Sequence, residues 1–109
     1  MATTFKNKIL KDIGVLPVLA VETDAGTRST IIGISLANLT ESVIYVSISI
    51  KGDDSVHGYF MKDVMLPPNS SLRALSAGEK LILAPSNQLY IVSDEDESVD
   101  AVLSYVDIV

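Results

Sequence analysis

The feature that most restricts the fold of this chain is the regular spacing of turn residues among short apolar runs between Leu66 and Val109. Turns are predicted at Pro67–Asn69, Ala77–Gly78, Pro85–Asn87 and the acidic run Asp94–Glu97. Short strands separated by turns about every ten residues are typical of an antiparallel sandwich or barrel. The chain is therefore predicted to be all-β, a single antiparallel, jelly-roll-like β-sandwich of about eight to nine short strands.

The first half of the chain continues this pattern, most clearly from Ser42 to Lys51. Four β-branched residues alternate there with tyrosine and serine: Ile44, Val46, Ile48 and Ile50 against Tyr45, Ser47 and Ser49. A period of two places the four aliphatic residues on one face of a strand. We expect that face to be buried in the core.

Two further strands are expected on either side of this one. In Arg28–Leu39, alternation puts Ile32, Ile34 and Leu36 on one face and Ile31, Gly33, Ser35 and Ala37 on the other. Gly33 suggests a bulge. In His57–Leu66, Tyr59 and Met61 are expected to lie opposite Phe60, Val64 and Leu66.

The two ends of the chain leave alternatives open. Phe5–Ile13 is a first strand or a short helical turn, and residues 1–14 are an N-terminal arm or an edge strand of one domain covering residues 1–109. Pro17–Val21 is expected as a second strand. Val99–Ile108 is apolar on both faces, so it is either central in the sandwich or packed against a neighbouring subunit.

Charge and composition exclude several classes of function. The net charge is −6, and residues 53–109 hold ten of the 14 acidic side chains, which disfavours a nucleic-acid partner. No cysteine is present, so there is no disulfide framework. No run is apolar enough for a signal peptide or a membrane span. The N-x-S/T matches at Asn38 and Asn69 are interpreted as chance.

No catalytic motif emerges from the sequence. His57 is the only histidine, and it stands in no G-x-S-x-G context. The four acids of Asp94–Glu97 are expected to be solvated and equivalent, unlike the paired carboxylates of a glycosidase. There is no Gly-rich phosphate loop. We predict no catalytic residue, no cofactor and no metal ligand, and a small hydrolase remains the least supported alternative.

Two groups of residues have side chains of the kinds found in binding sites. Asp94, Asp96, Ser98 and Asp100 place oxygen ligands at alternate positions, but Val99 and Tyr105 stand where a calcium loop needs Gly and Glu. A weak surface calcium site is left open. The tyrosines at positions 45, 59, 90 and 105 are either a sugar-stacking platform or part of core and interface packing.

The order of several short motifs resembles that of small β-sandwich structural proteins of tailed bacteriophage virions, of the marine and cyanobacterial phage type. The likeness covers nearly the whole chain. It is carried by residues 7–14 (NKILKDIG), 28–39 (RSTIIGISLANL), 66–72 (LPPNSSL), 78–83 (GEKLIL) and 99–105 (VDAVLSY). Ser86-Asn87 replaces the Gly-Asp turn expected before Leu89.

This resemblance implies a non-enzymatic structural component of a tailed phage virion, such as a capsid decoration, neck, collar or tail accessory protein. Its implied partners are other virion proteins and further copies of itself, as a homo-oligomer such as a trimer or hexamer. The protein would be made and assembled in the host cytoplasm and reside in the virion. The alternative is a small carbohydrate-binding or host-attachment module.

Overall fold

The computed structural model describes residues 2–75 and 78–109, so Ala77 of the turn predicted at Ala77–Gly78 lies outside the described residues. Those residues form strands and turns and contain no helix, which confirms the all-β prediction. The nine strands are β1 (Thr3–Ile13), β2 (Val18–Glu22), β3 (Arg28–Asn38), β4 (Ile44–Lys51), β5 (His57–Leu66), β6 (Ser71–Arg73), β7 (Leu81–Leu83), β8 (Gln88–Ser93) and β9 (Val99–Ile108).

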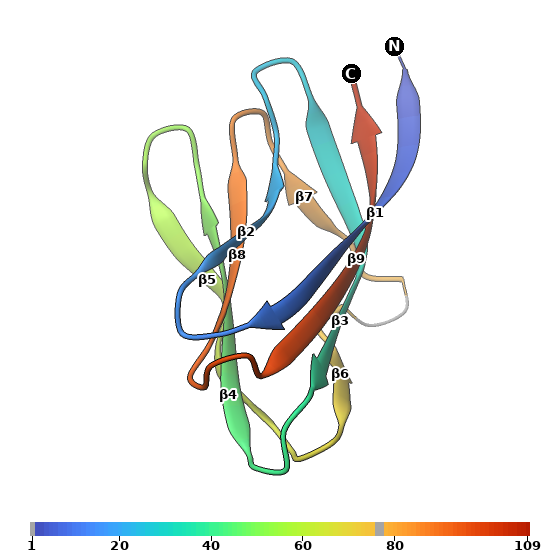
Figure 1. The fold of residues 1–109 in the computed structure, drawn as a ribbon. Helices are drawn as coiled ribbons and strands as arrows, with labels where there is room; N and C mark the ends of the chain where they lie inside the picture. Colours follow the sequence, from blue (N-terminus) through green and yellow to red (C-terminus); the bar gives the residue numbers. More distant parts are fainter. Residues whose placement is uncertain (1, 76–77) are drawn as a thin grey trace.

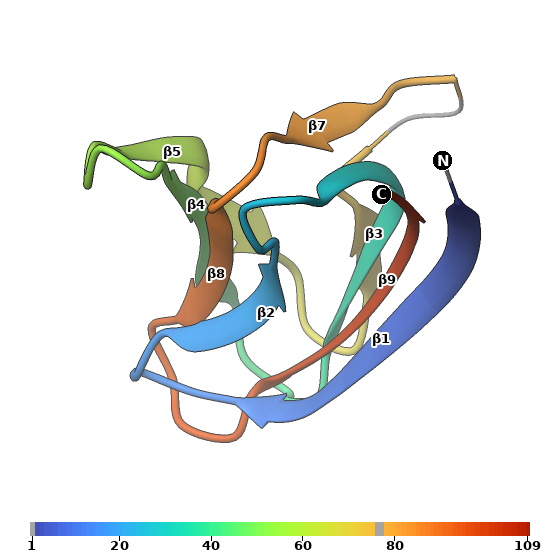
Figure 2. The same ribbon diagram turned by 90° about the horizontal axis from the view of Figure 1, so that it is seen from above.

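The strands form two antiparallel sheets that pack face to face. Sheet A has the order β1-β9-β3-β6, with β7 also paired to β3, and sheet B has the order β2-β8-β4-β5. Figure 2 looks between them, with β1, β9 and β3 on one side and β8, β4 and β5 on the other. The chain crosses repeatedly from one sheet to the other, which is jelly-roll connectivity and confirms the predicted sandwich.

This connectivity is that of one long hairpin rolled into a double layer. The β4–β5 hairpin is its tip, and β1 pairs with β9, β2 with β8, and β3 with β6 and β7. Rolling adds two further pairings, β3 with β9 and β4 with β8. Both termini therefore lie at the same end of the molecule, beside one another (Figure 1).

The core lies between the two sheets and is almost entirely aliphatic. As predicted for β4, Ile44, Val46 and Ile48 are fully buried, and Ile50 packs against the core. Sheet A contributes buried side chains from β3 and β9, including Ile34, Leu36, Ala101 and Leu103. This interdigitated layer supplies most of the apolar burial that stabilises the fold.

Two predicted strand faces are wrong because of bulges. The ladder between β3 and β9 shifts register between Ile31 and Gly33, so Ile31 joins Ile34 and Leu36 in the core and Ile32 is 44% exposed. The β4–β5 ladder shifts on both sides of Ile48, and Met61 pairs with Ile48 and packs against the core instead of sharing the face of Tyr59. An extra residue in a strand inverts the alternation beyond it.

The open alternatives for the chain ends are resolved by sheet A. Residues Thr3–Ile13 form a strand at the sheet edge, paired on one side with β9. β9 is central, between β1 and β3. Its Leu103 faces the core, while Val102 on its other face is exposed. The apolar character of both faces of β9 thus reflects a central position together with an apolar outer surface.

Candidate functional site

Three regions of the surface could carry function: the outer face of sheet B, the outer face of sheet A, and the acidic turns. Among the residues that the structure describes, no group of three His, Cys, Asp or Glu side chains could hold a metal ion. No helix long and apolar enough to cross a bilayer occurs in the described ranges.

The outer face of sheet B gathers three of the four tyrosines. In the ladder, Ser49 on β4 is directly opposite Tyr59 on β5 and Tyr90 on β8, so the three side chains form one row. Tyr45 lies further along β4 on the same exposed face. The fourth tyrosine, Tyr105, packs against the core from sheet A. The sequence patterns did not predict this grouping, because it depends on which strands are neighbours.

A hollow of about 510 Å³ lies over this row and is called here the tyrosine hollow. It is lined by Pro17, Ser49, Lys51, Ser55, His57, Tyr59, Tyr90 and Val92. Tyrosine rings, a proline and a valine give it apolar walls, and Lys51, His57 and two serines give it polar groups. This combination of apolar lining and a few converging polar side chains is typical of small-ligand sites.

Hydrogen bonds and ring contacts fix the side chains of the tyrosine hollow. His57 Nε2 and Ser49 Oγ share a hydrogen bond of 2.9 Å, and the rings of His57 and Tyr90 lie 5.8 Å apart, tilted by 49°. The Tyr90 hydroxyl donates to Gln88 Oε1 at 2.7 Å. Lys62 Nζ lies 5.0 Å from the centre of the Tyr59 ring. The lining is therefore partly preorganised.

The Ser49–His57 pair lacks the rest of a catalytic triad. Ser49 lies within β4 on the face of a sheet, and His57 is exposed. No hydrogen bond from His57 to a carboxylate occurs in residues 2–75 and 78–109. A serine nucleophile needs a base that is itself oriented by a third group. Ser49 and His57 are thus joined by one hydrogen bond, without an orienting carboxylate among the described residues.

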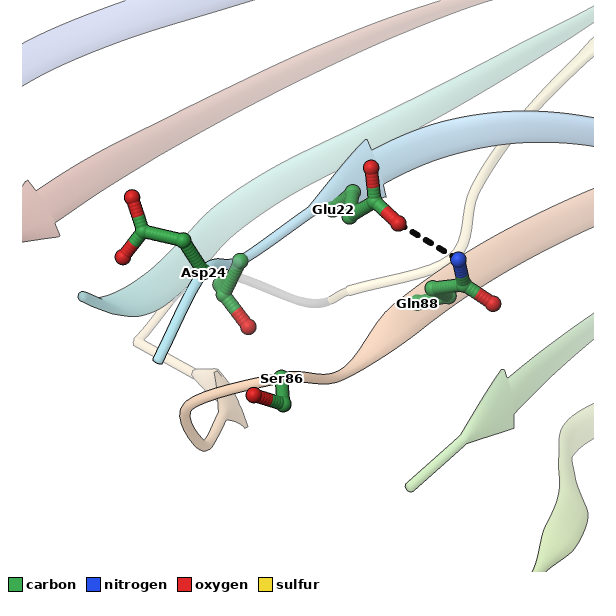
Figure 3. Close-up of a pocket in the computed structure, with 5 residues that line it drawn as sticks. Glu22, Asp24, Ser86 and Gln88 are labelled. Atoms are coloured by element: carbon green, nitrogen blue, oxygen red, sulfur yellow. Dashed lines mark hydrogen bonds between the residues drawn. The ribbon is translucent and has the colours of Figure 1, made fainter. Parts of the chain in front are cut away.

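A second depression, with acidic lining residues, lies at the edge of sheet B (Figure 3). Its lining is Glu22, Thr23, Asp24, Ser86 and Gln88. The Gln88 amide donates to Glu22, as the dashed line in Figure 3 marks, and Asp24 accepts from the Gly26 backbone N–H at 2.9 Å. Hydrogen bonds from Thr27 and Gly26 lower the pKa of Asp24. Both carboxylates thus serve local structure, the second by closing the turn between Asp24 and Thr27.

Among the residues with the spacing of a calcium loop, Asp94 and Asp100 are hydrogen-bonded to different strands. Asp94 Oδ1 accepts from the Tyr45 backbone N–H at 2.9 Å, on β4. Asp100 accepts from the Asp12 N–H at 3.0 Å and from Lys11 Nζ at 2.9 Å, on β1. Ser98 is buried and bonded to Ser93. The alternate spacing in the sequence therefore has a structural explanation: the carboxylates of Asp94 and Asp100 hold neighbouring strands in place, and the Ser98 hydroxyl is buried.

Two ion pairs join edge strand β1 to β9. Lys6 Nζ lies 2.8 Å from Asp107 Oδ2, and Lys11 Nζ lies 2.9 Å from Asp100 Oδ2. Burial tends to raise the pKa of Asp107, but hydrogen bonds from Lys6 and Ser29 lower it overall. The Asp12 N–H and Lys11 lower the pKa of Asp100. These lysines are thus engaged within the chain.

The outer face of sheet A carries a group of apolar side chains that we name the apolar face: the exposed residues Phe5, Ile9, Ile32, Ile82 and Val102, and the half-buried Val106. The ladder aligns them across strands. Phe5 is opposite Val106, Val106 is opposite Thr30, and Thr30 is opposite Ile82. Exposed fractions of 76% for Phe5, 61% for Ile9 and 65% for Ile82 leave much apolar area in contact with water.

No known protein family and no curated protein matches this sequence. Solved structures with the same fold do match, at low identity. The chain is similar to a protein of Bacillus endospore appendages, described as disulfide-linked pili, with a TM-score of 0.58, 6% identity, and coverage of 96% of this chain and 86% of that one.

It is also similar to the Drosophila NLP core, described in terms of pentamer formation and histone binding, with a TM-score of 0.56, 13% identity, and coverage of 97% and 99%. A third match comes from the acid-stable capsid of Helicobacter pylori bacteriophage KHP30, with a TM-score of 0.52, 11% identity, and coverage of 100% and 89%. At these identities the similarity concerns the fold, and it includes one phage capsid protein.

Proposed function

We propose that this protein is a non-enzymatic structural subunit of a tailed phage virion, of the marine and cyanobacterial type that its sequence resembles. It acts by protein–protein assembly as a capsid decoration, neck, collar or tail accessory protein. Its partners are further copies of itself and other virion proteins. It is made and assembled in the host cytoplasm, and an absence of cysteine suits that reducing compartment.

The observation that carries this proposal is the apolar face. A sandwich that works alone normally keeps the outer face of each antiparallel sheet polar. Here Phe5 and Ile9 project from β1 and Ile82 from β7, and Val102 on β9 lies between these two strands. Several exposed apolar side chains on one face of a small domain are typical of a protein–protein interface. Covering this face would also add burial to a domain with a small core.

The edge of sheet A gives the same region a second means of association. Strand β1 is 11 residues long and pairs with β9 on one side, and most of its side chains are exposed. Its outer edge carries backbone groups able to pair with another strand. An interface that covers the apolar face and meets this edge would bury both.

The structural neighbours support an assembly role. The three come from a pilus, from a protein described in terms of pentamer formation, and from a phage capsid. The repeated use of this sandwich as a building block agrees with the apolar face described above. Closed symmetry is the common outcome for identical subunits, and a trimer or hexamer would suit a phage particle.

Light scattering on the purified protein tests the assembly. We expect an oligomer at micromolar concentration that dissociates when Ile9 and Ile82 are both replaced by Lys. Leu16→Lys is the matched control, because Leu16 is an exposed aliphatic side chain in the β1–β2 connection, away from the apolar face. A strictly monomeric wild type that also fails to bind empty particles would contradict the proposal.

The virion part of the proposal has its own test. Mass spectrometry of purified virions should detect this chain in multiple copies per particle, and imaging of labelled particles should place it at repeated positions. If the protein forms an oligomer in solution but is missing from virions, the proposed assembly is supported and the proposed place in the virion is contradicted.

A further inference from the structure

The tyrosine hollow belongs to the sheet opposite the apolar face, so assembly through sheet A leaves its function unexplained. We propose that the tyrosine hollow binds a sugar carrying a carboxylate, such as a uronic acid unit of a glycan. Binding at this site does not depend on the assembly proposed above.

The dimensions of the hollow suit one sugar ring. Tyr59 and Tyr90 stand on either side of Ser49, one strand away in each direction. Neighbouring strands are about 4.8 Å apart, so the backbones of the two tyrosines are roughly 9–10 Å apart. The volume of about 510 Å³ lies within the range of small-ligand sites. A pyranose ring can therefore lie along this row against Tyr59 and Tyr90, in contact with the His57 ring that is hydrogen-bonded to Ser49.

The chemistry of the walls matches a sugar in particular. A sugar ring presents C–H groups on its faces and hydroxyl groups around its rim. Tyr59 is 61% exposed and offers an aromatic surface to the C–H groups, and Val92 and Pro17 extend the apolar wall. Ser49, Ser55 and His57 provide hydrogen-bonding groups for the rim hydroxyls.

Charge selects an acidic sugar. The protein carries a net charge of −6, yet the lining of the hollow contains Lys51 and His57 and no carboxylate. In the ladder Lys51 lies opposite His57 on one side and Gln88 on the other, and it forms no ion pair with any described residue. A ligand carboxylate would supply the missing partner through a charge-assisted hydrogen bond.

Other anions suit the hollow less well. The lining has no arginine and no glycine-rich backbone, which are the usual means of holding phosphate. Asp53 and Asp54 lie in the β4–β5 turn beside the lining residue Ser55, so an extended polyanion such as a nucleic acid would be repelled. One lysine beside aromatic walls fits a single carboxylate.

The test is a titration of the isotope-labelled protein with glucuronate, followed by amide chemical shifts in NMR spectra, with glucose as the neutral analogue. We expect shifts centred on Ser49, Lys51 and Tyr90, and a dissociation constant for glucuronate about tenfold lower than that for glucose. Shifts centred elsewhere, or equal affinity for the two sugars, would overturn the proposal.

Variants assign the interaction to the lining. Tyr59→Ala should weaken glucuronate binding about tenfold. Lys51→Met should remove the preference for glucuronate over glucose, and Lys51→Gln serves the same purpose if the Met variant folds poorly. Tyr45→Ala and Lys8→Met are matched controls, because Tyr45 shares the face of sheet B outside the hollow and Lys8 is exposed on β1. Equal losses in the controls, or no binding by the wild type, would overturn the proposal.

Discussion

Asn38 is a buried side chain that joins several loops through both ends of its amide. Its Nδ2 donates to the carbonyl oxygens of Ser42, Leu66 and Pro67 at 2.9–3.0 Å. Its Oδ1 accepts from the N–H and the hydroxyl of Thr40, both at 2.8 Å. With 5% exposure, this side chain is closed to glycosylation in the folded protein, which agrees with interpreting its N-x-T match as chance.

Replacing Asn38 should therefore be costly. Asn38→Asp would place a carboxylate against three carbonyl oxygens, and we expect a loss of about 3 kcal/mol or more in the free energy of unfolding. Asn38→Ala should cost about 2 kcal/mol. Urea denaturation measures both, with Asn69→Asp as the exposed control. Equal stability of Asn38→Asp and wild type would contradict the hydrogen-bond assignment.

The acidic run Asp94–Glu97 is exposed, but its first residue has a structural bond. Neutralising Glu95, Asp96 and Glu97 to the corresponding amides should shift stability by less than about 1 kcal/mol. Asp94→Ala should cost about 1 kcal/mol, since it removes the acceptor for the Tyr45 N–H. Melting curves with and without calcium complete the test. A rise of many degrees with calcium would instead indicate a cation site.

Asp100 and Asp107 make the stability of sheet A sensitive to acid. Their pKa values are lowered in the folded protein, by the Asp12 N–H and Lys11 for Asp100, and by Lys6 and Ser29 against the effect of burial for Asp107. A lowered pKa stabilises the fold at every pH above the unfolded value of about 3.9. That stabilisation is lost as the pH falls from there through the folded pKa.

We therefore expect the urea midpoint to fall as the pH is lowered below about 4. The variant carrying Asp100→Asn and Asp107→Asn should be less stable than wild type at neutral pH and should show a flatter fall. Asp53→Asn, in an exposed turn, is the control. An unchanged slope in the double variant would mean that other carboxyl groups dominate the acid response.

At the scale of single elements, β3 and β4 provide a matched comparison. Ile48 on β4 is fully buried, whereas Ile32 lies at the β3 bulge on the apolar face. Ile48→Ala should cost roughly 2–4 kcal/mol through lost burial and the cavity left behind. Ile32→Ala in the monomer should cost less than about 1 kcal/mol. Denaturation midpoints of the two variants measure the difference. Similar losses of stability in both would mean that the position of the bulge in β3 is wrong.

These two strands also indicate how much of the core can be predicted from sequence patterns. In β4 the alternation is unbroken on its inner face, so the buried side chains Ile44, Val46 and Ile48 could be predicted. In β3 Gly33 indicated a bulge, but not the side on which the extra residue falls, and that choice decides whether Ile31 or Ile32 is buried. The choice depends on the register with β9, which is set by contacts far along the chain.

The tyrosine hollow lay beyond sequence prediction for a related reason. Tyr59 and Tyr90 are each paired with Ser49, but only because β4 lies between β5 and β8. The pairing of β4 with β8 exists only after the long hairpin has rolled up. The aromatic residues could be named from the sequence, whereas their grouping on one face is a property of the topology.

For the whole molecule, the rolled hairpin implies slow folding. Partners in the β1–β9 ladder are far apart in sequence, with Thr3 opposite Ile108 and Leu10 opposite Ala101. Because such contacts close long loops before they add stability, refolding is expected in roughly milliseconds to seconds. Stopped-flow dilution from urea would measure the rate. Refolding within microseconds would mean that local contacts dominate the transition state.

The neighbouring ends of the chain have a mechanical consequence. Ala2 and Val109 exchange backbone hydrogen bonds, and β1 and β9 run antiparallel from that point. Tension applied between the two ends would load the rungs of this ladder one after another, so the strands would peel apart at low force. Force entering through the flat faces would instead be shared by many rungs at once. Attachment through the faces of the sheets would therefore resist pulling better than attachment through the two ends.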